Sequence, residues 1–446
     1  MPSIQLFAPR NNSQPVAWCH SGPVSPNEFL HAVGQMAERL PERRFIFNLC
    51  ADRYHFLVTF CAAMLRRQTN LLPPNHAERT LAQLHAAHPD AYAVSDQPMN
   101  VAGLEMLPYP ALASNGVAHG EIPAIAAEHI AAIAFTSGST GQPMPHPKSW
   151  GSLATEAALT ASRLELQAGL HFLGTVPPQH MYGLGSTLML PLHNGGVIHA
   201  GQPLFPADIR LALEALPAPR VLVTTPLHLR ICLEQQLEFP PLALILSAAA
   251  PLSLELAQQA EAAFDAPLME IYGSTETGTI ATRRTSHGEN WESLAGVHFS
   301  HGENGLTRVE GGHIQTHVEL QDVIEATTDN SHFRLAGRAA DMLNIAGKRA
   351  SLGDLNLQLN IIPGVRDGVF FAPDEEPGKA VRLSALVVAP ELSEQQIIAA
   401  LRQAIDPAFL PRPLYKVDEL PRNATGKLPR EALRELLAGL NTKHPS

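Results

Sequence analysis

The N-terminal part of the chain alternates segments with apolar residues at helical spacing and short runs that are continuously apolar. The apolar residues between Phe29 and Leu40 have the helical spacing, and they follow Ser25-Pro26-Asn27-Glu28, which matches a capping box with proline in the first turn. The run RFIFNLC at 44–50 predicts a buried strand. Further elements are expected as helices over 54–67 and 79–87 and a short strand at 70–72. This alternation predicts βαβ units and an α/β fold with mostly parallel sheets flanked by helices.

The same rhythm of strand and helix is expected from Leu153 to Tyr272. Within it, residues 244–247 predict a strand, residues 254–264 a helix and residues 268–272 another strand. Between 361 and 413 the pattern again alternates strand and helix, which is compatible with a small α+β domain. The pattern therefore predicts a large N-terminal domain and a smaller C-terminal one.

The stretch around which the chain is organised is AAIAFTSGSTGQPMPHPKSW, at 131–150. Residues 131–135 are apolar and predict a buried strand, which runs into six residues without a bulky side chain: Thr136, Ser137, Gly138, Ser139, Thr140 and Gly141. Glycines let the backbone approach a ligand, and hydroxyl and N–H groups can then surround phosphate oxygens. An ordinary surface loop is the alternative on composition alone. A Walker loop is excluded, because Lys148 follows Pro147 where that motif needs glycine.

Composition and charge exclude several classes of function. The chain has 446 residues and a net charge of −11 without a Lys/Arg-rich cluster, so nucleic acid is not an expected partner. Its 4 cysteines are scattered without metal-ligand spacing, which favours buried thiols in a reducing compartment. No apolar run is long enough for a membrane span and the N-terminus lacks a signal pattern, so a cytoplasmic protein is expected.

TSGSTG followed by Gln142-Pro143 resembles the pyrophosphate-binding loop of the adenylate-forming (AMP-binding) enzymes, which include the acyl-CoA synthetases. Further segments resemble that family's motifs in the same order along nearly the whole chain: PPQHMYG at 177–183, SAAAPL at 247–252, YGSTETG at 272–278, LQDVIE at 320–325, the hinge and following loop at 338–349, and PRNATGKLPR at 421–430. The chain departs from the family at Met144, where lysine is usual, at Leu320-Gln321, where Thr-Gly is usual, and at Ala340, beside which Asp341 can act as the pivot.

The resemblance implies a role for each matched residue. The catalytic residues would be Lys427, Thr275, Glu276 and His180, with Glu276 also holding the metal ion. ATP would be bound by the loop from Thr136 to Gly141, by Lys148 as a substitute for the missing loop lysine, and by Tyr272, Gly273, Asp322 and Arg338. The acid pocket would comprise His180, Tyr182, Gly183, Ser247, Ala248 and Ala249, where the two alanines replace usual glycines and narrow it. Gly347, Lys348 and Arg349 would form the thiol-side loop. Without the resemblance, His180 beside Tyr182 is more typical of a loop or core position, and the Gly426-Lys427 pair is more typical of the surface.

The implied activity is ATP- and Mg²⁺-dependent activation of a carboxylic acid to an acyl-adenylate, followed by transfer to the thiol of CoA or of a carrier-protein phosphopantetheine. The implied domains are 1–337 and a mobile unit at 338–446 that carries Lys427. A compact pocket favours a small aromatic or short acyl acid, and TSGSTGQPMPHPKSW resembles the compact ligases of aryl-polyene pigment clusters. The alternatives are a nucleotide-binding regulator that keeps the fold without turnover and an enzyme that stops at the adenylate or oxidises it.

Overall fold

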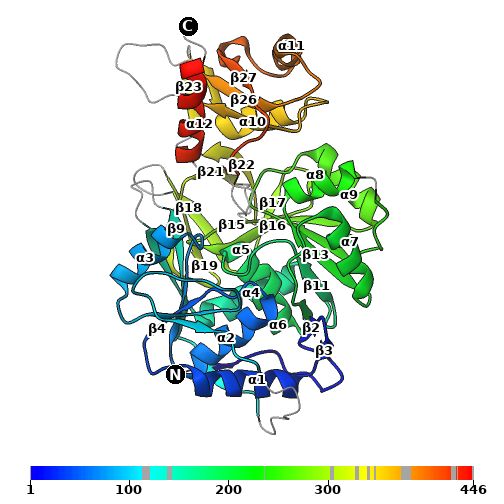
Figure 1. Ribbon diagram of the computed structural model, residues 1–446. Helices are drawn as coiled ribbons and strands as arrows, with labels where there is room; N and C mark the ends of the chain where they lie inside the picture. Colours follow the sequence, from blue (N-terminus) through cyan, green and yellow to red (C-terminus); the bar gives the residue numbers. More distant parts are fainter. Residues whose placement is uncertain are drawn as a thin grey trace.

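The computed structural model describes residues 2–112, 121–137, 143–235, 237–301, 306–326, 331–338, 342–345, 348–372, 383–422, 428 and 430–443. In Figure 1 a large lower part contains the elements up to β22, and a smaller upper part contains β23 to β27 with α10, α11 and α12. The predicted mixed α/β fold, with a small C-terminal unit, is confirmed. No helix in the described ranges is long and apolar enough to cross a membrane.

The first sheet of the large part has 6 strands and is parallel except at one edge. Its order is β10 (Pro143–Ser149), β9 (Ile130–Ser137), β5 (Thr69–Leu72), β4 (Phe45–Asn48), β6 (Tyr92–Ser95) and β7 (Met106–Pro108). Ile46 packs into the core that contains α1 (Pro26–Arg39) and α2 (Arg53–Leu65), whereas Phe47 packs with α3 (Glu78–Ala87) on the opposite face. Burial on both faces explains why this strand is continuously apolar in sequence. The capping box predicted at Ser25 and Glu28 is confirmed at the start of α1.

The second sheet has 11 strands, with a parallel centre and antiparallel edges. Its order is β21 (Asp322–Ala326), β22 (His332–Arg338), β17 (Trp291–Ser293), β16 (Gly278–Arg283), β15 (Leu268–Ser274), β14 (Leu244–Ser247), β13 (Arg220–Thr224), β11 (His171–Gly174), β12 (Val197–His199), β2 (Ala17–Cys19) and β3 (Gly22–Val24). Three helices cover one face, on the right in Figure 1: α7 (Pro206–Ala215), α8 (Pro226–Glu234) and α9 (Leu254–Phe264).

The other helices of the large part connect the two sheets. They are α4 (Trp150–Arg163) and a nearly continuous helix made of α5 (Met181–Gly183), a π-helical stretch at Leu184–Met189 and α6 (Leu190–Asn194). Both pack with α1 and α2 in the largest hydrophobic core. Two small sheets complete this part, one of β1 (Ser3–Gln5) and β8 (Ala124–Ala126), the other of β18 (Val297–His301), β19 (Thr307–Gly311) and β20 (Ile314–Leu320).

A single buried arginine ties α2 to the second sheet. Arg53 begins α2 and is fully buried, and its guanidinium donates to the carbonyl oxygens of Gly174 (3.2 Å), Val176 (2.7 Å), His199 (3.3 Å) and Gly201 (2.7 Å). It also donates to the Thr187 hydroxyl at 3.0 Å. Because burial is costly for an ion unless its donors are satisfied, these bonds let the charge remain in the interior. Burial lowers the Arg53 pKa to about 10.

The upper part has its own hydrophobic cores. It contains the hairpin of β23 (Met342–Ile345) and β24 (Lys348–Ser351), the sheet β25 (Asp367–Phe371), β26 (Ser384–Val388) and β27 (Leu414–Lys416), and the helices α10 (Leu352–Asn360), α11 (Glu394–Ala404) and α12 (Arg430–Lys443). Its cores contain only residues from 343 onward. Arg230 at α8 donates to the carbonyl oxygen of Arg366 at 2.6 Å and so joins the two parts. The boundary at 337 and 338 remains a prediction, because residues 339–341 lie outside the described ranges.

Candidate active site

The hairpin of β9 and β10 carries the ends of the predicted phosphate loop. Ser137 pairs with Pro143 and Thr136 with Met144, so the chain reverses direction between them. Four of the predicted loop residues, Gly138, Ser139, Thr140 and Gly141, lie outside the described residues, as does the side chain of Ser137. The Thr136 hydroxyl lies 3.0 Å from His146 Nε2, across the hairpin. Thr136 is thereby fixed at the rim of the loop.

The turn between β15 and β16 carries the predicted metal and α-phosphate residues. Ser274 and Thr277 exchange hydrogen bonds across it: the Ser274 N–H donates to Thr277 Oγ1 at 3.0 Å, and the Thr277 N–H to Ser274 Oγ at 3.2 Å. A Cβ at Gly273 would lie 2.0 Å from the carbonyl oxygen of Gly278, and Gly278 itself has φ +71°. The turn therefore needs both glycines, which explains the sequence pattern around Thr275 and Glu276.

Three side chains far from the turn in sequence hold its backbone. Lys148 Nζ donates to the carbonyl oxygen of Glu276 at 2.6 Å, and His313 Nε2 donates to that of Thr277 at 2.7 Å. The Thr279 N–H donates to Glu156 Oε1 at 2.7 Å. Lys148, Glu156 and His313 are all buried. They fix the turn against the β9–β10 hairpin, α4 and β20.

Glu276 can present an ionised carboxylate at this turn. Its side chain is 41% exposed, and its Oε1 lies 3.5 Å from His146 Nε2. Burial raises the pKa of Glu276. Hydrogen bonds from Ser274 and the backbone, together with the neighbouring His146 and Lys148, lower it by more than burial raises it, so the pKa lies below its ordinary value. Burial also lowers the pKa of Lys148, against the opposing effect of Glu156 and Glu276.

Sequence reasoning missed three of these residues: His146, Glu156 and His313. A usable signal existed only for His146. Side chains alternate along a strand, so Met144, His146 and Lys148 share one face of β10, and His146 stands between the position of the usual lysine and Lys148. Lys148 was expected to hold pyrophosphate. In the structure its ammonium donates instead to the backbone carbonyl oxygen of Glu276, in the turn between β15 and β16.

The residues predicted to bind ribose come together at the edge of the second sheet. The Tyr272 hydroxyl donates to Asp322 Oδ2 at 2.7 Å, and Asp322 pairs with Arg338 in the β21–β22 ladder. The Tyr272 ring lies against Trp291 (5.4 Å between centroids) and Phe333 (5.8 Å), which orients the hydroxyl. The side chain of Arg338 lies outside the described residues.

One cavity of about 210 Å³ joins the residues predicted for ATP and those predicted for the acid. It lies beyond the carboxyl ends of β9, β14 and β15, the usual place for ligands in open α/β sheets. The predicted residues that line it are Thr136, Gly273 and Thr275 on the nucleotide side, and His180, Tyr182, Gly183, Ala248 and Ala249 on the acid side. The structure also adds Glu156, Gln179, Met181 and Ile271 to the lining.

Three of the predicted acid-pocket residues differ from the expectation in detail. The Tyr182 hydroxyl lies 3.0 Å from the carbonyl oxygen of Thr224 and 2.9 Å from that of Leu246, so Tyr182 contributes its ring to the wall. Ser247 is fully buried at the end of β14 and is not among the described residues that line the cavity. Ala249 has φ +76°, a backbone conformation that favours glycine. The narrowing expected from this alanine is therefore accompanied by local backbone strain.

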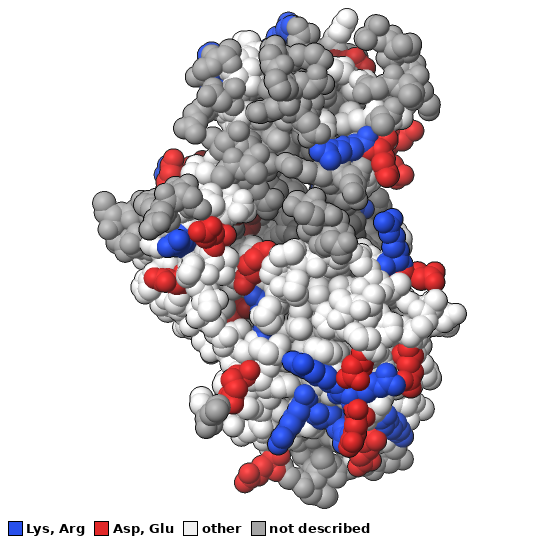
Figure 2. All heavy atoms as spheres, turned by 90° about the vertical axis from the view of Figure 1, so that its left-hand side faces the viewer, with Lys and Arg blue, Asp and Glu red and all other residues white. Residues whose placement is uncertain are grey.

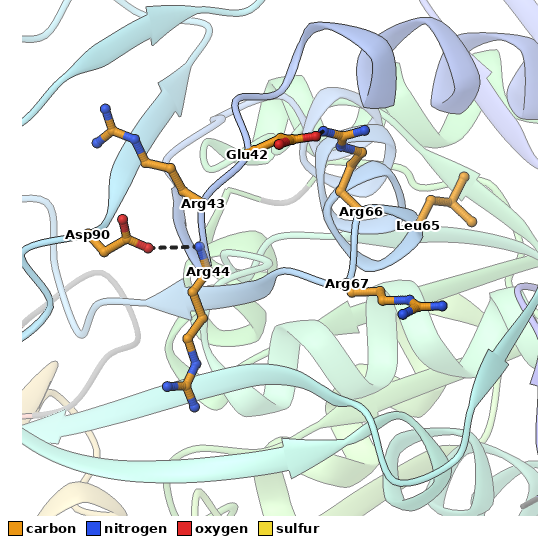
Figure 3. A pocket seen from close by; sticks show the side chains of 7 residues that line it. All are labelled: Glu42, Arg43, Arg44, Leu65, Arg66, Arg67 and Asp90. Atoms are coloured by element: carbon orange, nitrogen blue, oxygen red, sulfur yellow. Dashed lines mark hydrogen bonds and ion pairs between the residues drawn. The ribbon is translucent and has the colours of Figure 1, made fainter.

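A second hollow, of about 480 Å³, lies at the opposite, amino-terminal ends of β4, β5 and β6. Figure 3 shows the side chains of Arg43, Arg44 and Arg67 pointing in different directions, with Arg66 beside Glu42 and the Arg44 N–H bonded to Asp90. Figure 2 likewise shows charges of both signs interspersed at the lower end of the molecule. Because these guanidinium groups do not converge on one point, this hollow is not a candidate for the phosphate site.

The residues predicted for the C-terminal part are described only in part. Lys348 is exposed and forms an ion pair with Asp406 within that part. Gly347, the side chain of Arg349 and the predicted catalytic Lys427 lie outside the described residues. The placement of Lys427 against the cavity therefore stays a prediction.

Known proteins resemble the chain in sequence and fold. The family model described as AMP-binding enzyme matches residues 38–306. The 4-coumarate–CoA ligase of Halorhodospira halophila is 31% identical over 324 residues, which cover 69% of this chain and 78% of the relative. The indoleacetate–CoA ligase of Aromatoleum aromaticum is 26% identical over 349 residues, 69% of this chain and 67% of the relative. The ATP-bound structure of MatB from Rhodopseudomonas palustris superposes with a TM-score of 0.82 at 17% identity, over 98% of this chain and 100% of that one. The chain thus belongs to the AMP-binding enzymes, the adenylate-forming acyl-CoA synthetase superfamily.

Proposed function

We propose that this protein is an ATP-dependent ligase that activates a small aromatic carboxylic acid as its acyl-adenylate and transfers the acyl group to a thiol. The observation that carries the proposal is the shared cavity: Thr136 and Thr275, from the phosphate motifs, line the same hollow as His180 and Ala249, from the acid pocket. A carboxylate in this cavity would lie beside the position of the α-phosphate. Such a placement supplies the proximity that the first step needs.

The volume of the cavity and the names of the relatives support an aromatic acid of modest size. About 210 Å³ is below the ~300–1,000 Å³ typical of sites for drug-sized ligands. Two relatives are named for 4-coumarate and indoleacetate, both aromatic acids. Their names also support CoA as the acceptor, and a likeness to surfactin synthase subunit 3 supports a carrier protein as the second candidate.

In the first step, a carboxylate oxygen of the acid attacks the α-phosphorus of ATP, and the bond to pyrophosphate breaks. Thr275 would contact the α-phosphate, the loop from Thr136 to Gly141 would hold the departing pyrophosphate, and Asp322 would accept from the ribose hydroxyls. Lys427 would lie between the carboxylate and the α-phosphate and cancel their repulsion. In the second step, a thiol loses its proton, attacks the acyl carbon and displaces AMP.

The Glu276 carboxylate fits a magnesium ion that accompanies ATP. Oxygen is the ligand that Mg²⁺ prefers, the side chain is partly exposed, and the lowered pKa keeps the group ionised. When bound there, the ion would neutralise part of the charge of the triphosphate. Lys148, by holding the Glu276 carbonyl, would set the direction of that carboxylate.

Release of pyrophosphate tests the proposal. The purified chain is incubated with MgATP and a panel of aromatic and aliphatic acids, first alone and then with CoA or with a carrier protein bearing phosphopantetheine. We expect acid-dependent pyrophosphate release that is fastest with single-ring aromatic acids, and thioester formation with one acceptor. ATP binding without release with any acid would favour the nucleotide-binding regulator instead. Adenylate formation without a thioester would favour an enzyme that stops at the adenylate.

A further inference from the structure

Glu156 is a buried carboxylate in the wall of the acid cavity, and the mechanism above does not use it. It lies on α4, faces the start of β16, and is only 5% exposed. Nearby cavity walls are formed by apolar side chains that include Met181 and Ile271. Burying a carboxylate in such surroundings is costly unless its oxygens have partners.

Only one of its two oxygens has a hydrogen-bond donor in the described part of the chain. Oε1 accepts from the Thr279 N–H at 2.7 Å. Oε2 lies against Gly278, where an added Cβ would be 2.3 Å away, and no described group donates a hydrogen bond to it. Gly278 lines the same cavity, so this oxygen lies at the cavity wall.

A positive charge, that of Lys148, lies near Glu156. The buried ammonium of Lys148 is close enough for the Glu156 carboxylate to raise its pKa, although burial lowers that pKa more strongly. Lys148 donates to the Glu276 carbonyl, and among the described contacts it forms no hydrogen bond or ion pair with Glu156. The carboxylate therefore stays in the interior with one oxygen still open to a donor.

The following inference rests on the proposed function. We propose that Glu156 selects aromatic acids that carry a hydrogen-bond donor, such as a phenolic hydroxyl or an amino group, on the end of the ring remote from the reacting carboxylate. Glu156 accepts from Thr279, which is four residues beyond Thr275 and lines the same cavity, so with the acid carboxylate beside Thr275 it would meet that remote end. An acid without a donor would leave Oε2 buried and unpaired, and sites of this kind discriminate strongly against such analogues. A second carboxylate at that end would be repelled by Glu156.

The test compares matched acids in the pyrophosphate-release assay with the full chain. The panel is 4-hydroxybenzoate, benzoate and the 1,4-dicarboxylate of benzene, with 4-hydroxycinnamate and cinnamate as a longer pair. For the wild type we expect kcat/KM to be ~10²-fold higher for each hydroxylated acid than for its unsubstituted partner. The dicarboxylate should be the poorest substrate.

Glu156→Gln keeps an oxygen for the Thr279 N–H but replaces Oε2 with an amide NH₂, which donates. We expect this variant to lose the preference for the hydroxylated acids to within a few-fold and to gain activity with the dicarboxylate. Exposed Glu255→Gln should leave the preference unchanged, and a thermal shift reports whether each variant is folded.

Turnover without a preference in the wild type, or an equal loss with every acid in Glu156→Gln, would overturn the role of Glu156 while leaving the proposed function intact. The second result would mean that Glu156 only supports Thr279. Absence of pyrophosphate release with every acid would overturn the proposed function and this inference with it.

Discussion

The ammonium of Lys148 lies 2.6 Å from the backbone carbonyl oxygen of Glu276, although 128 residues separate them in the chain. This contact joins the strand after the phosphate loop to the turn that bears the proposed metal ligand. It also gives a lysine at an unusual position a defined partner. The position of the usual loop lysine is taken by Met144, which is 52% exposed.

Lys148→Met should weaken the use of magnesium. The substitution keeps the aliphatic stem of the side chain but leaves the Glu276 carbonyl oxygen without its donor, so the backbone that orients the Glu276 carboxylate is no longer held in place. Removing a group that orients a metal ligand typically costs 10–100-fold in metal affinity or activity. Pyrophosphate release measured against Mg²⁺ concentration gives the shift, and exposed Lys416→Met serves as the control. An unchanged Mg²⁺ dependence in Lys148→Met would show that the contact does not position Glu276.

Ala249→Gly should widen the range of acids without loss of stability. A left-handed backbone costs a non-glycine residue roughly 1–2 kcal/mol, and glycine removes that strain while also removing a methyl group from the cavity wall. Ala248→Gly is the matched control, because Ala248 lines the same cavity without a positive φ. We expect bulkier aromatic acids to gain kcat/KM in both variants, but only Ala248→Gly to lose stability in urea unfolding. A clear loss of stability in Ala249→Gly would contradict the strain argument.

Lys427→Ala should separate the two half-reactions. The lysine is proposed to act only while the carboxylate approaches the α-phosphate, and the C-terminal part is proposed to turn about residues 338–341 before the thiol attacks. The variant should therefore lose acid-dependent pyrophosphate release by ~10²-fold or more and still convert supplied acyl-adenylate to the thioester. Equal loss in both assays would contradict two separate arrangements of the domains.

Folding stability should fall as the pH drops below about 6.5, in part through His193. Burial, aided by the charge of Arg10, lowers the His193 pKa from 6.5 to about 4. Between these values the unfolded chain binds a proton that the folded chain does not, so acid favours unfolding by up to about 3 kcal/mol for this residue. The effect is absent above pH 6.5 and complete below about 4.

His193→Phe, which keeps a ring against Trp150, should flatten that part of the stability profile in urea unfolding at a series of pH values. Exposed His20→Asn should not change it. An identical pH slope in His193→Phe and wild type would show that other groups carry the acid sensitivity.

Local sequence was sufficient for the strands and turns that carry the motifs. The turn around Thr275 was predictable because only glycine fits at positions 273 and 278, and the start of α1 because its cap is formed by neighbouring residues. Glu156 was not predictable, because a glutamate on an amphipathic helix is ordinarily placed on the solvent face. Its burial depends on Thr279, which pairs with it from a strand 123 residues away. Contacts of this kind arise only when two sheets and a helix are already packed together.

The hydrogen bonds of Arg53 have a consequence for how the protein is made. Its acceptors lie between 121 and 148 positions later in the chain. Until residues 174–201 have been synthesised, the guanidinium lacks its full set of acceptors, so burying its charge together with α2 is costly. The face of the first sheet that α2 covers is therefore expected to be completed only after β11 and β12 of the second sheet have been made.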